Sequence, residues 1–169
     1  MSAEVYTYRW IYRILYKYAN ILATILLLLY LLPALFSFDG RITDYLYILM
    51  IVGGIYLINR HFIKLYKIVP YRIEIIGDTI HCSQYAFSRK KVELRFSDID
   101  KLEGGIFEGK SSGLMKLHTT SRNLTIGFFI KISGAKALES VVLAKVNKDL
   151  YHKVLDSLGI DRTKLKKKE

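Results

Sequence analysis

Residues 18–38, YANILATILLLLYLLPALFSF, form a run of 21 amino acids without a charged side chain. About 20 helical residues, each rising roughly 1.5 Å, span the ~30 Å hydrocarbon core of a bilayer. The run is therefore long enough to cross a membrane as one helix. A cleaved signal peptide is the alternative, but the preceding segment is long and aromatic, and Leu35 and Ser37 form a poor cleavage site.

A second apolar segment, residues 44–60, follows after a short connector. Its uncharged part is short for a span, but the long stem of Arg60 can reach the interface. We therefore expect a transmembrane helical hairpin over residues 18–60, with helices at 18–38 and 44–60. Re-entrant placement of the second segment is the alternative. Gly53 and Gly54 are expected to let the second helix approach the first closely. The alternative is that this glycine pair forms a face for oligomerisation.

Positive charge flanks the expected hairpin and gives its orientation. Basic residues precede the first run and follow the second, whereas the connector holds one arginine and two aspartates. Both termini should therefore be cytoplasmic, in an integral protein of the inner (plasma) membrane. Residues 1–17 form an aromatic and basic segment with an expected interfacial helix over 5–17. The residues expected at the membrane interface are Arg9, Trp10, Arg13, Arg60, Lys64 and Lys67.

Composition limits the partners of the remaining chain. From Arg60 onward it contains 22 Lys and Arg against 12 Asp and Glu, and residues 61–160 suffice for one cytoplasmic domain. Such a basic domain is attracted to an anionic leaflet. Nucleic acid is excluded as a partner because no nucleic-acid-binding motif accompanies the charge. The scattered histidines and the single Cys82 predict no metal and no cofactor.

A change of hydrophobic period at residue 71 indicates strands. Apolar and polar residues alternate over 71–75, and Gly77-Asp78 supplies a tight turn. Further strands are predicted over 79–87, over 92–96, and then, after a short strand and a flexible loop at 104–113, over 115–120. Residues 124–132 place five apolar side chains on one face and should be central to the core.

The helical period returns after Gly134. The spacing predicts one long helix, or one broken near Asn147, that ends at Gly159. The lysine-rich tail, residues 161–169, is expected to be disordered.

Two spans, short antiparallel strands and a closing amphipathic helix resemble the bacterial pleckstrin-homology-like (PH-like) membrane proteins. The residues that carry the resemblance are the strand at 92–96 with 97–99, the loop through Gly113, the strands at 115–120 and 124–132, and the helix from Ala135. The resemblance implies an α+β membrane protein whose PH-like antiparallel β-barrel or sandwich is closed by a C-terminal α-helix. It also implies no catalytic activity.

The resulting functional hypothesis is a non-enzymatic interaction or scaffold module. Its expected partners are the lipid bilayer and a membrane protein or a second copy of the chain. An accessory subunit of a transport or assembly complex is an alternative that differs only in its partner.

Two loops are candidates for phosphate chemistry. Many eukaryotic pleckstrin-homology domains bind inositide headgroups at the loop joining their first two strands, but here that loop is the short, acidic Gly77-Asp78. The basic turn Arg89-Lys90-Lys91 is instead the candidate contact for anionic lipid, with a solvated loop as the alternative.

The second loop, residues 104–111 (GGIFEGKS), satisfies the phosphate-loop pattern of nucleotide-binding proteins. That chemistry needs a buried parallel strand before the loop and a helix after it. Residues 100–103 are too polar for such a strand, and Ser112-Gly113 is a poor helix opening. A glycine-rich hairpin loop is the preferred interpretation. The nucleotide-binding alternative rests on Gly104, Gly109, Lys110 and Ser111.

Overall fold

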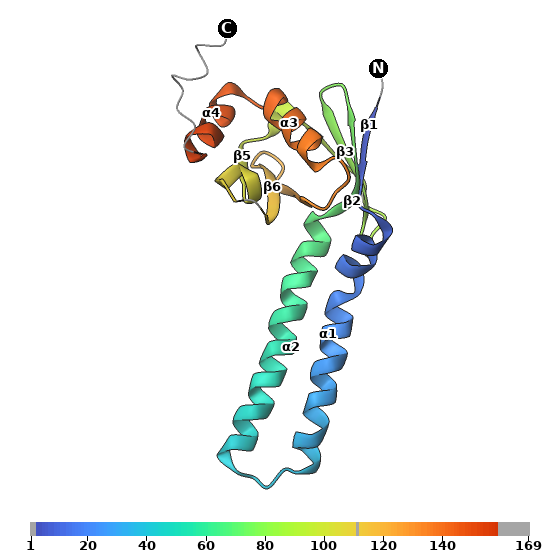
Figure 1. The fold of residues 1–169 in the computed structure, drawn as a ribbon, viewed down its shortest axis with the longest axis vertical. Coiled ribbons are helices and arrows are strands. Elements are labelled where there is room, and N and C mark those ends of the chain that lie inside the picture. Colours follow the sequence, from blue (N-terminus) through green and yellow to red (C-terminus); the bar gives the residue numbers. More distant parts are fainter. Residues whose placement is uncertain (1–2, 111, 159–169) are drawn as a thin grey trace. The chain divides into compact units, whose positions relative to one another are not determined.

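The computed structural model describes residues 3–110 and 112–158, and the chain divides into two compact units (Figure 1). The first, the helical hairpin, is Trp10–Lys67. The second, the sheet domain, combines Met1–Arg9 with Ile68–Glu169. The sheet domain is therefore discontinuous in the sequence, because the whole hairpin is inserted between its first and second segments.

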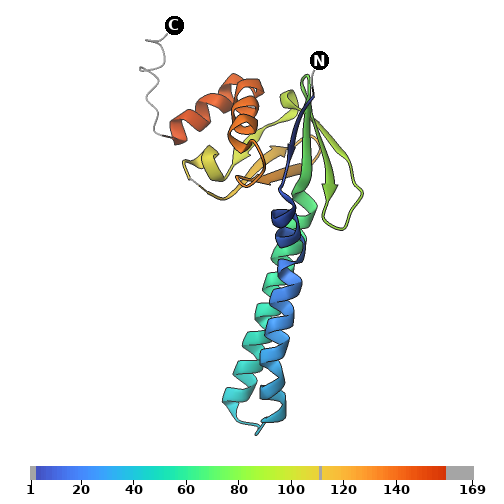
Figure 2. The ribbon, with the colours of Figure 1, turned by 45° about the vertical axis from the view of Figure 1, so that its right-hand side comes forward.

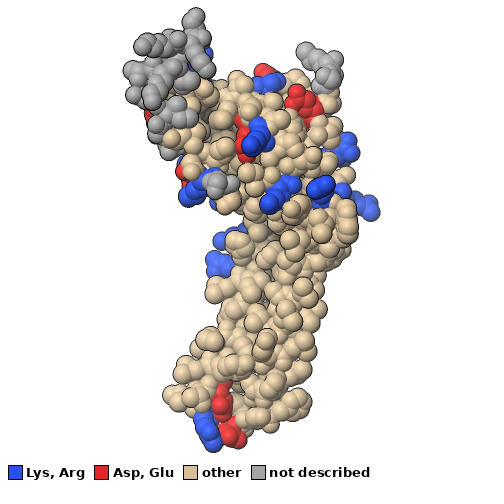
Figure 3. Space-filling model, in the orientation of Figure 1, with Lys and Arg blue, Asp and Glu red and all other residues tan. Residues whose placement is uncertain are grey.

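The hairpin consists of α1 (Trp10–Phe36) and α2 (Ile42–Ile68). Both are long and apolar enough to cross a membrane, and only 6% of the most apolar window of each is buried. On the face shown in Figure 3, charged side chains gather at the two ends of the hairpin and are absent between them. Two apolar helices compatible with a membrane protein are thus confirmed. Each is longer than predicted, because charged residues bound an apolar run without ending a helix.

A polar network joins the two helices inside their apolar stretch. The Asn20 side-chain amide donates a hydrogen bond to Asn59 Oδ1 (3.0 Å), and Asn59 Nδ2 in turn donates to Thr24 Oγ1 (2.9 Å) and to the Ile55 carbonyl (2.9 Å). The Tyr66 hydroxyl contacts Asn20 Oδ1. Amides in hydrocarbon are costly unless they are paired, so this network favours one antiparallel register of α1 and α2.

Of the two adjacent glycines in α2, Gly54 faces α1. A Cβ atom on Gly54 would lie 3.9 Å from Leu27 Cδ1, whereas one on Gly53 would meet nothing within 4 Å. Packing inside the hairpin therefore involves Gly54.

Two antiparallel sheets form the sheet domain. The first has the order β1-β2-β3-β4, and the second has the order β5-β6-β7. Their bounds are β1 Glu4–Thr7, β2 Pro70–Ile76, β3 Thr79–Tyr85, β4 Val92–Arg95, β5 Lys101–Glu103, β6 Leu114–Thr119 and β7 Leu124–Phe129. Neither sheet is closed within the described residues. The predicted α+β class is confirmed, whereas the PH-like barrel or sandwich stays a prediction.

Strand β1 corrects the prediction for the N-terminal segment. Residues 4–7 form a strand that pairs with β2, and α1 begins at Trp10, so no interfacial helix covers 5–17. Tyr6 and Tyr8 lie in the segment expected at the membrane interface but are buried in the domain core. The alternation of β1 is too short to predict a strand, and its partner lies beyond the whole hairpin. The domain boundaries change accordingly, with residues 61–67 in α2 and residues 3–9 in the sheet domain.

Tyr8 connects the two sheets. It is 3% exposed, it forms an isolated bridge with Ile132, and its hydroxyl oxygen accepts a hydrogen bond from the Phe129 N–H at 2.7 Å. Its ring also packs edge-on against Tyr71 of β2. The N-terminal segment is thus part of the core of the sheet domain.

The loop predicted as flexible is anchored. It contains a 3-10 turn, η2 (Gly105–Glu108), whose Phe107 is 2% exposed and packs edge-on against Phe128 of β7. β7 is central to the core as expected, since Ile126 and Phe128 are fully buried, but it ends at Phe129. Glycine spacing predicted a loop, whereas burial of one aromatic ring fixes its conformation.

Two helices follow the last strand of the domain. α3 (Ala135–Lys145) and α4 (Lys148–Ser157) are separated near Asn147, which confirms the broken form of the predicted helix. The Asn147 side chain caps α4 by accepting a hydrogen bond from the Asp149 N–H at 3.3 Å. The predicted stop at Gly159 and the tail at 161–169 lie outside the described residues.

Cys82 provides a probe of the folded domain because it is the only cysteine in the chain. It lies on β3 with 1% exposure, and burial raises the pKa of its thiol to about 12. Thiolate is the reactive form, so Cys82 should react only when the domain opens.

Replacing Tyr8 by Phe should destabilise the sheet domain by about 1 kcal/mol, because the part-buried Phe129 N–H would lose this acceptor. The measurement is the rate of Cys82 labelling in the full chain in detergent. Tyr151→Phe is the control, since no hydrogen bond of its hydroxyl is present in the described part of the chain. Equal labelling rates in the two variants would contradict the role of Tyr8.

Replacing Asn59 by Leu should weaken the hairpin by about 1 kcal/mol, because Asn20 and Thr24 would each lose their hydrogen bond to Asn59. Reversible unfolding in mixed micelles measures this change. A double-mutant cycle with Asn20→Leu should show coupling between the two sites. Additive effects would show that the two side chains do not act through the network.

Candidate membrane-surface site

Antiparallel register brings three chain segments to one end of the first sheet. Thr7, the last residue of β1, pairs with Arg72 near the start of β2, and Pro70 pairs with Tyr85 at the end of β3. The chain leaves this end towards α1 and returns to it from α2. We call it the tethered end. The opposite end carries the Gly77-Asp78 turn.

Residues 86–91, the basic loop, project from the tethered end between β3 and β4 (Figure 2). The loop begins with a turn in which the Ser88 N–H donates to the Tyr85 carbonyl (3.3 Å), and the Lys90 N–H then donates to Ser88 Oγ (3.2 Å). The predicted lipid-contact residues Arg89, Lys90 and Lys91 are all exposed. Within residues 3–110 and 112–158, none of these three side chains forms an ion pair.

An exposed aromatic ring accompanies these cations. Phe87 is 62% exposed, and its backbone φ of 56° lies in the left-handed region. That conformation is rare for a bulky residue and costs on the order of 1–3 kcal/mol. Sequence reasoning missed Phe87, because its exposure depends on where the turn begins.

A shallow groove of about 520 Å³ adjoins the basic loop on the outer face of β2, β3 and β4. Its two carboxylates contact neighbouring side chains, Glu74 that of Arg72 and Glu93 the Nδ1 atom of His81 (3.3 Å). Arg89 and Lys91 also line the groove. The net positive charge of this region therefore comes from the basic loop.

The predicted membrane-interface residues lie at one end of the hairpin and in the segment before it. Arg9 precedes α1, Trp10 is its first residue, and Arg13 follows within the first turns. On α2, Arg60 donates a hydrogen bond to the Tyr56 hydroxyl (3.4 Å), and Lys64 and Lys67 follow towards its end. Because the helices are antiparallel, these side chains gather at the end of the hairpin opposite the connector. In the connector itself, Arg41 pairs with Asp39 (3.4 Å).

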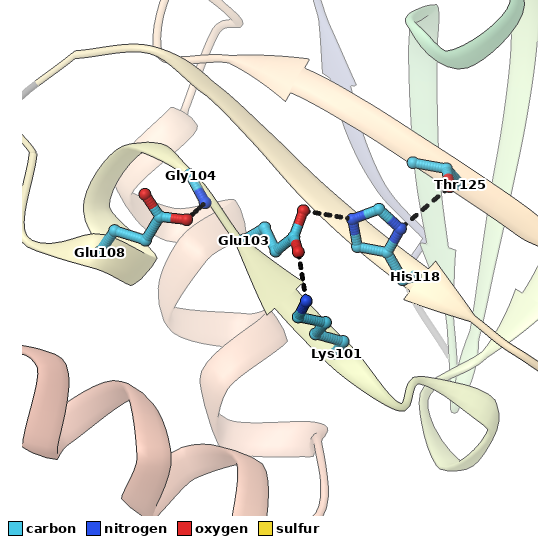
Figure 4. A network of polar contacts seen from close by, with 6 residues as sticks. All are labelled: Lys101, Glu103, Gly104, Glu108, His118 and Thr125. Carbon is cyan, nitrogen blue, oxygen red and sulfur yellow. Dashed lines mark hydrogen bonds and ion pairs between the residues drawn. The ribbon is translucent and has the colours of Figure 1, made fainter.

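The phosphate-loop string has a different geometry from a nucleotide site. Gly104 and Gly109 have positive φ, and Lys110 pairs with Glu108 (2.8 Å) instead of facing an open cradle. The Gly104 N–H donates to Glu108 Oε1 (2.9 Å), so a carboxylate of the loop occupies an amide that a phosphate would use (Figure 4). Lys110 and this N–H hold the pKa of Glu108 below its usual range. Ser111 lies outside the described residues.

Close packing accounts for the first two glycines of this loop. A Cβ atom on Gly104 would lie 2.2 Å from the Leu114 carbonyl oxygen, and one on Gly105 would lie 2.6 Å from Met115 Cγ. The loop therefore needs glycine in order to lie against β6. After Gly113 the chain enters β6 directly, without the helix that presents amides to a phosphate.

A second polar cluster ties together the strands of the β5-β6-β7 sheet (Figure 4). His118 Nε2 lies 3.0 Å from Glu103 Oε2, and His118 Nδ1 lies 3.0 Å from Thr125 Oγ1. Lys101 also pairs with Glu103 at 2.5 Å, and together with His118 it lowers the pKa of that carboxyl. In this cluster, His118 of β6 contacts one residue on each neighbouring strand, Glu103 of β5 and Thr125 of β7. Strand register, which the sequence does not reveal, brings it together.

Glu139 on α3 is the buried carboxylate of the described residues. It is 4% exposed, and its Oε1 has no hydrogen-bond partner there. Burial raises the pKa of Glu139, while Lys136 opposes the shift. The stability that this group contributes is therefore present below its unfolded-state pKa and is lost as pH rises through the folded-state pKa.

In the described part of the chain, no group of three or more His, Cys, Asp or Glu side chains is placed to hold a metal ion. Searches with protein-family models, curated proteins and solved structures give no match for this chain. Functional inference therefore depends on the geometry above.

Substitutions in the glycine-rich loop should separate packing from nucleotide binding. Gly104→Ala should cost about 3 kcal/mol of domain stability, because the new Cβ meets backbone at 2.2 Å. Gly77→Ala is the matched control, with φ of 57° and nothing within 4 Å, and should cost about 1 kcal/mol. Cys82 labelling measures both.

Lys110→Ala should leave the stability of the sheet domain unchanged, since the ion pair of Lys110 is exposed. Equilibrium titration with ATP and GTP completes the test. Micromolar binding that disappears in Lys110→Ala would contradict the packing interpretation.

Proposed function

We propose that this chain is a non-enzymatic membrane protein whose cytoplasmic, PH-like sheet domain serves as an interaction module for a membrane protein partner. The pairing of β1 with β2 across the inserted hairpin carries the proposal. It means that two chain connections anchor the domain, one before α1 and one after α2.

Both connections are short. Tyr8 and Arg9 alone separate β1 from α1, and Val69 alone separates α2 from β2. Neither connection contains a Gly/Ser-rich linker segment. Two short connections suit a module that acts on a neighbour in the same membrane.

The arrangement of the strands supports the PH-like assignment. Two antiparallel sheets are followed by a helix whose Leu138 and Val142 are fully buried. This is the kind of strand-then-helix order that the resemblance implies. The basic residues at the hairpin end opposite the connector support a cytoplasmic location of the sheet domain, because positively charged flanks of membrane spans are retained in the cytoplasm.

The outer edge of β4 is the docking surface that the structure favours. β4 pairs with β3 on one side. On the other side Arg122 Nη1 donates to the Glu93 carbonyl at 3.2 Å, so this carbonyl points away from β3. In an antiparallel strand the N–H and C=O of one residue point the same way, so the Glu93 N–H also faces outward. An extended segment of a partner can add to such an edge.

Replacing Glu93 by Pro tests the function and the edge together. Proline removes the outward N–H without breaking the ladder to β3, so a partner bound by strand addition should be lost. Glu93→Gln is the matched control, because it removes the same charge and keeps the N–H. The measurement is co-purification of a stoichiometric protein with the full chain from membranes in mild detergent.

The proposal expects a partner with the parent protein and with Glu93→Gln, and at least a tenfold loss with Glu93→Pro, on the order of 1.4 kcal/mol. Absence of any stoichiometric protein would contradict the interaction-module function. Equal recovery with both variants would contradict the β4 edge as the docking surface.

A further inference from the structure

We infer that the basic loop, residues 86–91, is a membrane-contact loop that inserts Phe87 into an anionic leaflet while Arg89, Lys90 and Lys91 contact lipid phosphates. This inference rests on the membrane anchoring in the proposed function and does not depend on the protein partner. It adds insertion of the Phe87 ring to the anionic-lipid contact that the sequence predicts for Arg89, Lys90 and Lys91.

The position of the loop in the sheet is the first argument. The loop follows Tyr85, which pairs with Pro70, and Pro70 lies two residues beyond the last residue of α2. The chain thus connects this end of the sheet to both apolar helices. A short tether gives the loop a high effective concentration of lipid headgroups, which a free partner would not have.

The chemistry of the loop is the second argument. Three consecutive exposed cations have no ion pair in the described part of the chain, and the nearby carboxylates Glu74 and Glu93 contact Arg72 and His81 instead. Basic side chains near an anionic leaflet are attracted to its negative surface potential. An aromatic ring beside such cations is the combination found in interfacial membrane anchors.

The conformation of Phe87 is the third argument. Its left-handed backbone turns a 62% exposed ring outward at the loop, whereas Tyr85 and Ala86 immediately before it are buried. Burial of the ring in the acyl region would remove this apolar surface from water, which favours insertion. An acidic peptide would satisfy the cations but gives no reason for the exposed ring.

Fluorescence quenching by lipid tests the contact in the full chain. Trp10 is the only tryptophan, so Phe87→Trp in a Trp10→Phe background places the single fluorophore in the loop. Ile76→Trp in the same background is the matched control, because Ile76 is 43% exposed at the opposite end of β2. Both proteins are reconstituted into nanodiscs of phosphatidylcholine with brominated acyl chains, with and without phosphatidylglycerol.

The inference expects quenching of the Phe87→Trp protein to exceed that of the Ile76→Trp control roughly twofold or more in discs containing phosphatidylglycerol, and to fall without the anionic lipid. Charge reversal of the loop by Arg89→Glu with Lys90→Glu should reduce the quenching to the level of that control. A second matched control is Lys148→Glu with Lys153→Glu, an equal charge change on exposed positions of α4 that should leave the quenching unchanged.

Folding of each variant is verified by protection of Cys82, so a failed fold is not mistaken for lost contact. Equal quenching of the fluorophores in the loop and in the β2 control would overturn the inference. So would an equal decrease in quenching after charge reversal in the loop and after charge reversal on α4. Quenching of the loop fluorophore only by a bromine-labelled acidic peptide would also overturn it, in favour of a protein ligand. None of these results depends on the outcome of the Glu93→Pro experiment.

Discussion

Strand β1 hydrogen-bonds to β2 although the entire helical hairpin separates the two strands in the sequence. Closing so long a loop would be entropically unfavourable for a flexible chain. The hairpin reduces this cost, because α1 and α2 run antiparallel and bring their two outer ends to the same side. The pairing also requires residues 9 and 68 to lie on one side of any membrane that the hairpin crosses. A cleaved signal peptide would remove β1 and its buried tyrosines from the domain.

Polar contacts within each unit reinforce that constraint. In the hairpin, Asn20 and Asn59 pair where an unpaired amide would be costly. In the sheet domain, the Tyr8 hydroxyl accepts from the Phe129 N–H and links the two open sheets. Both contacts join segments far apart in the sequence. The surface that we assign to membrane contact follows from the same architecture, because the β1 and β2 termini define the end from which the basic loop projects.

Local sequence patterns predicted many elements but not their partners. The alternation around Gly77-Asp78, the strand before Ser97 and the helix break near Asn147 are all present. Residues 4–8 were misread, since tyrosines in a short segment fit an interfacial belt as well as a buried strand. The cluster of Glu103, His118 and Thr125 was missed for a related reason, because each residue alone resembles an ordinary exposed strand position.

The sequence by itself determined two apolar helices, their basic flanks and an antiparallel domain, because hydrophobic period and charge are local properties. It also identified Arg89, Lys90 and Lys91 as a basic turn between two strands. Only the tertiary structure decided that the N-terminal residues complete the sheet, that the phosphate-loop glycines serve packing, and that Phe87 is exposed beside the basic residues. These depend on register, burial and close approach between distant segments, which no window of sequence encodes.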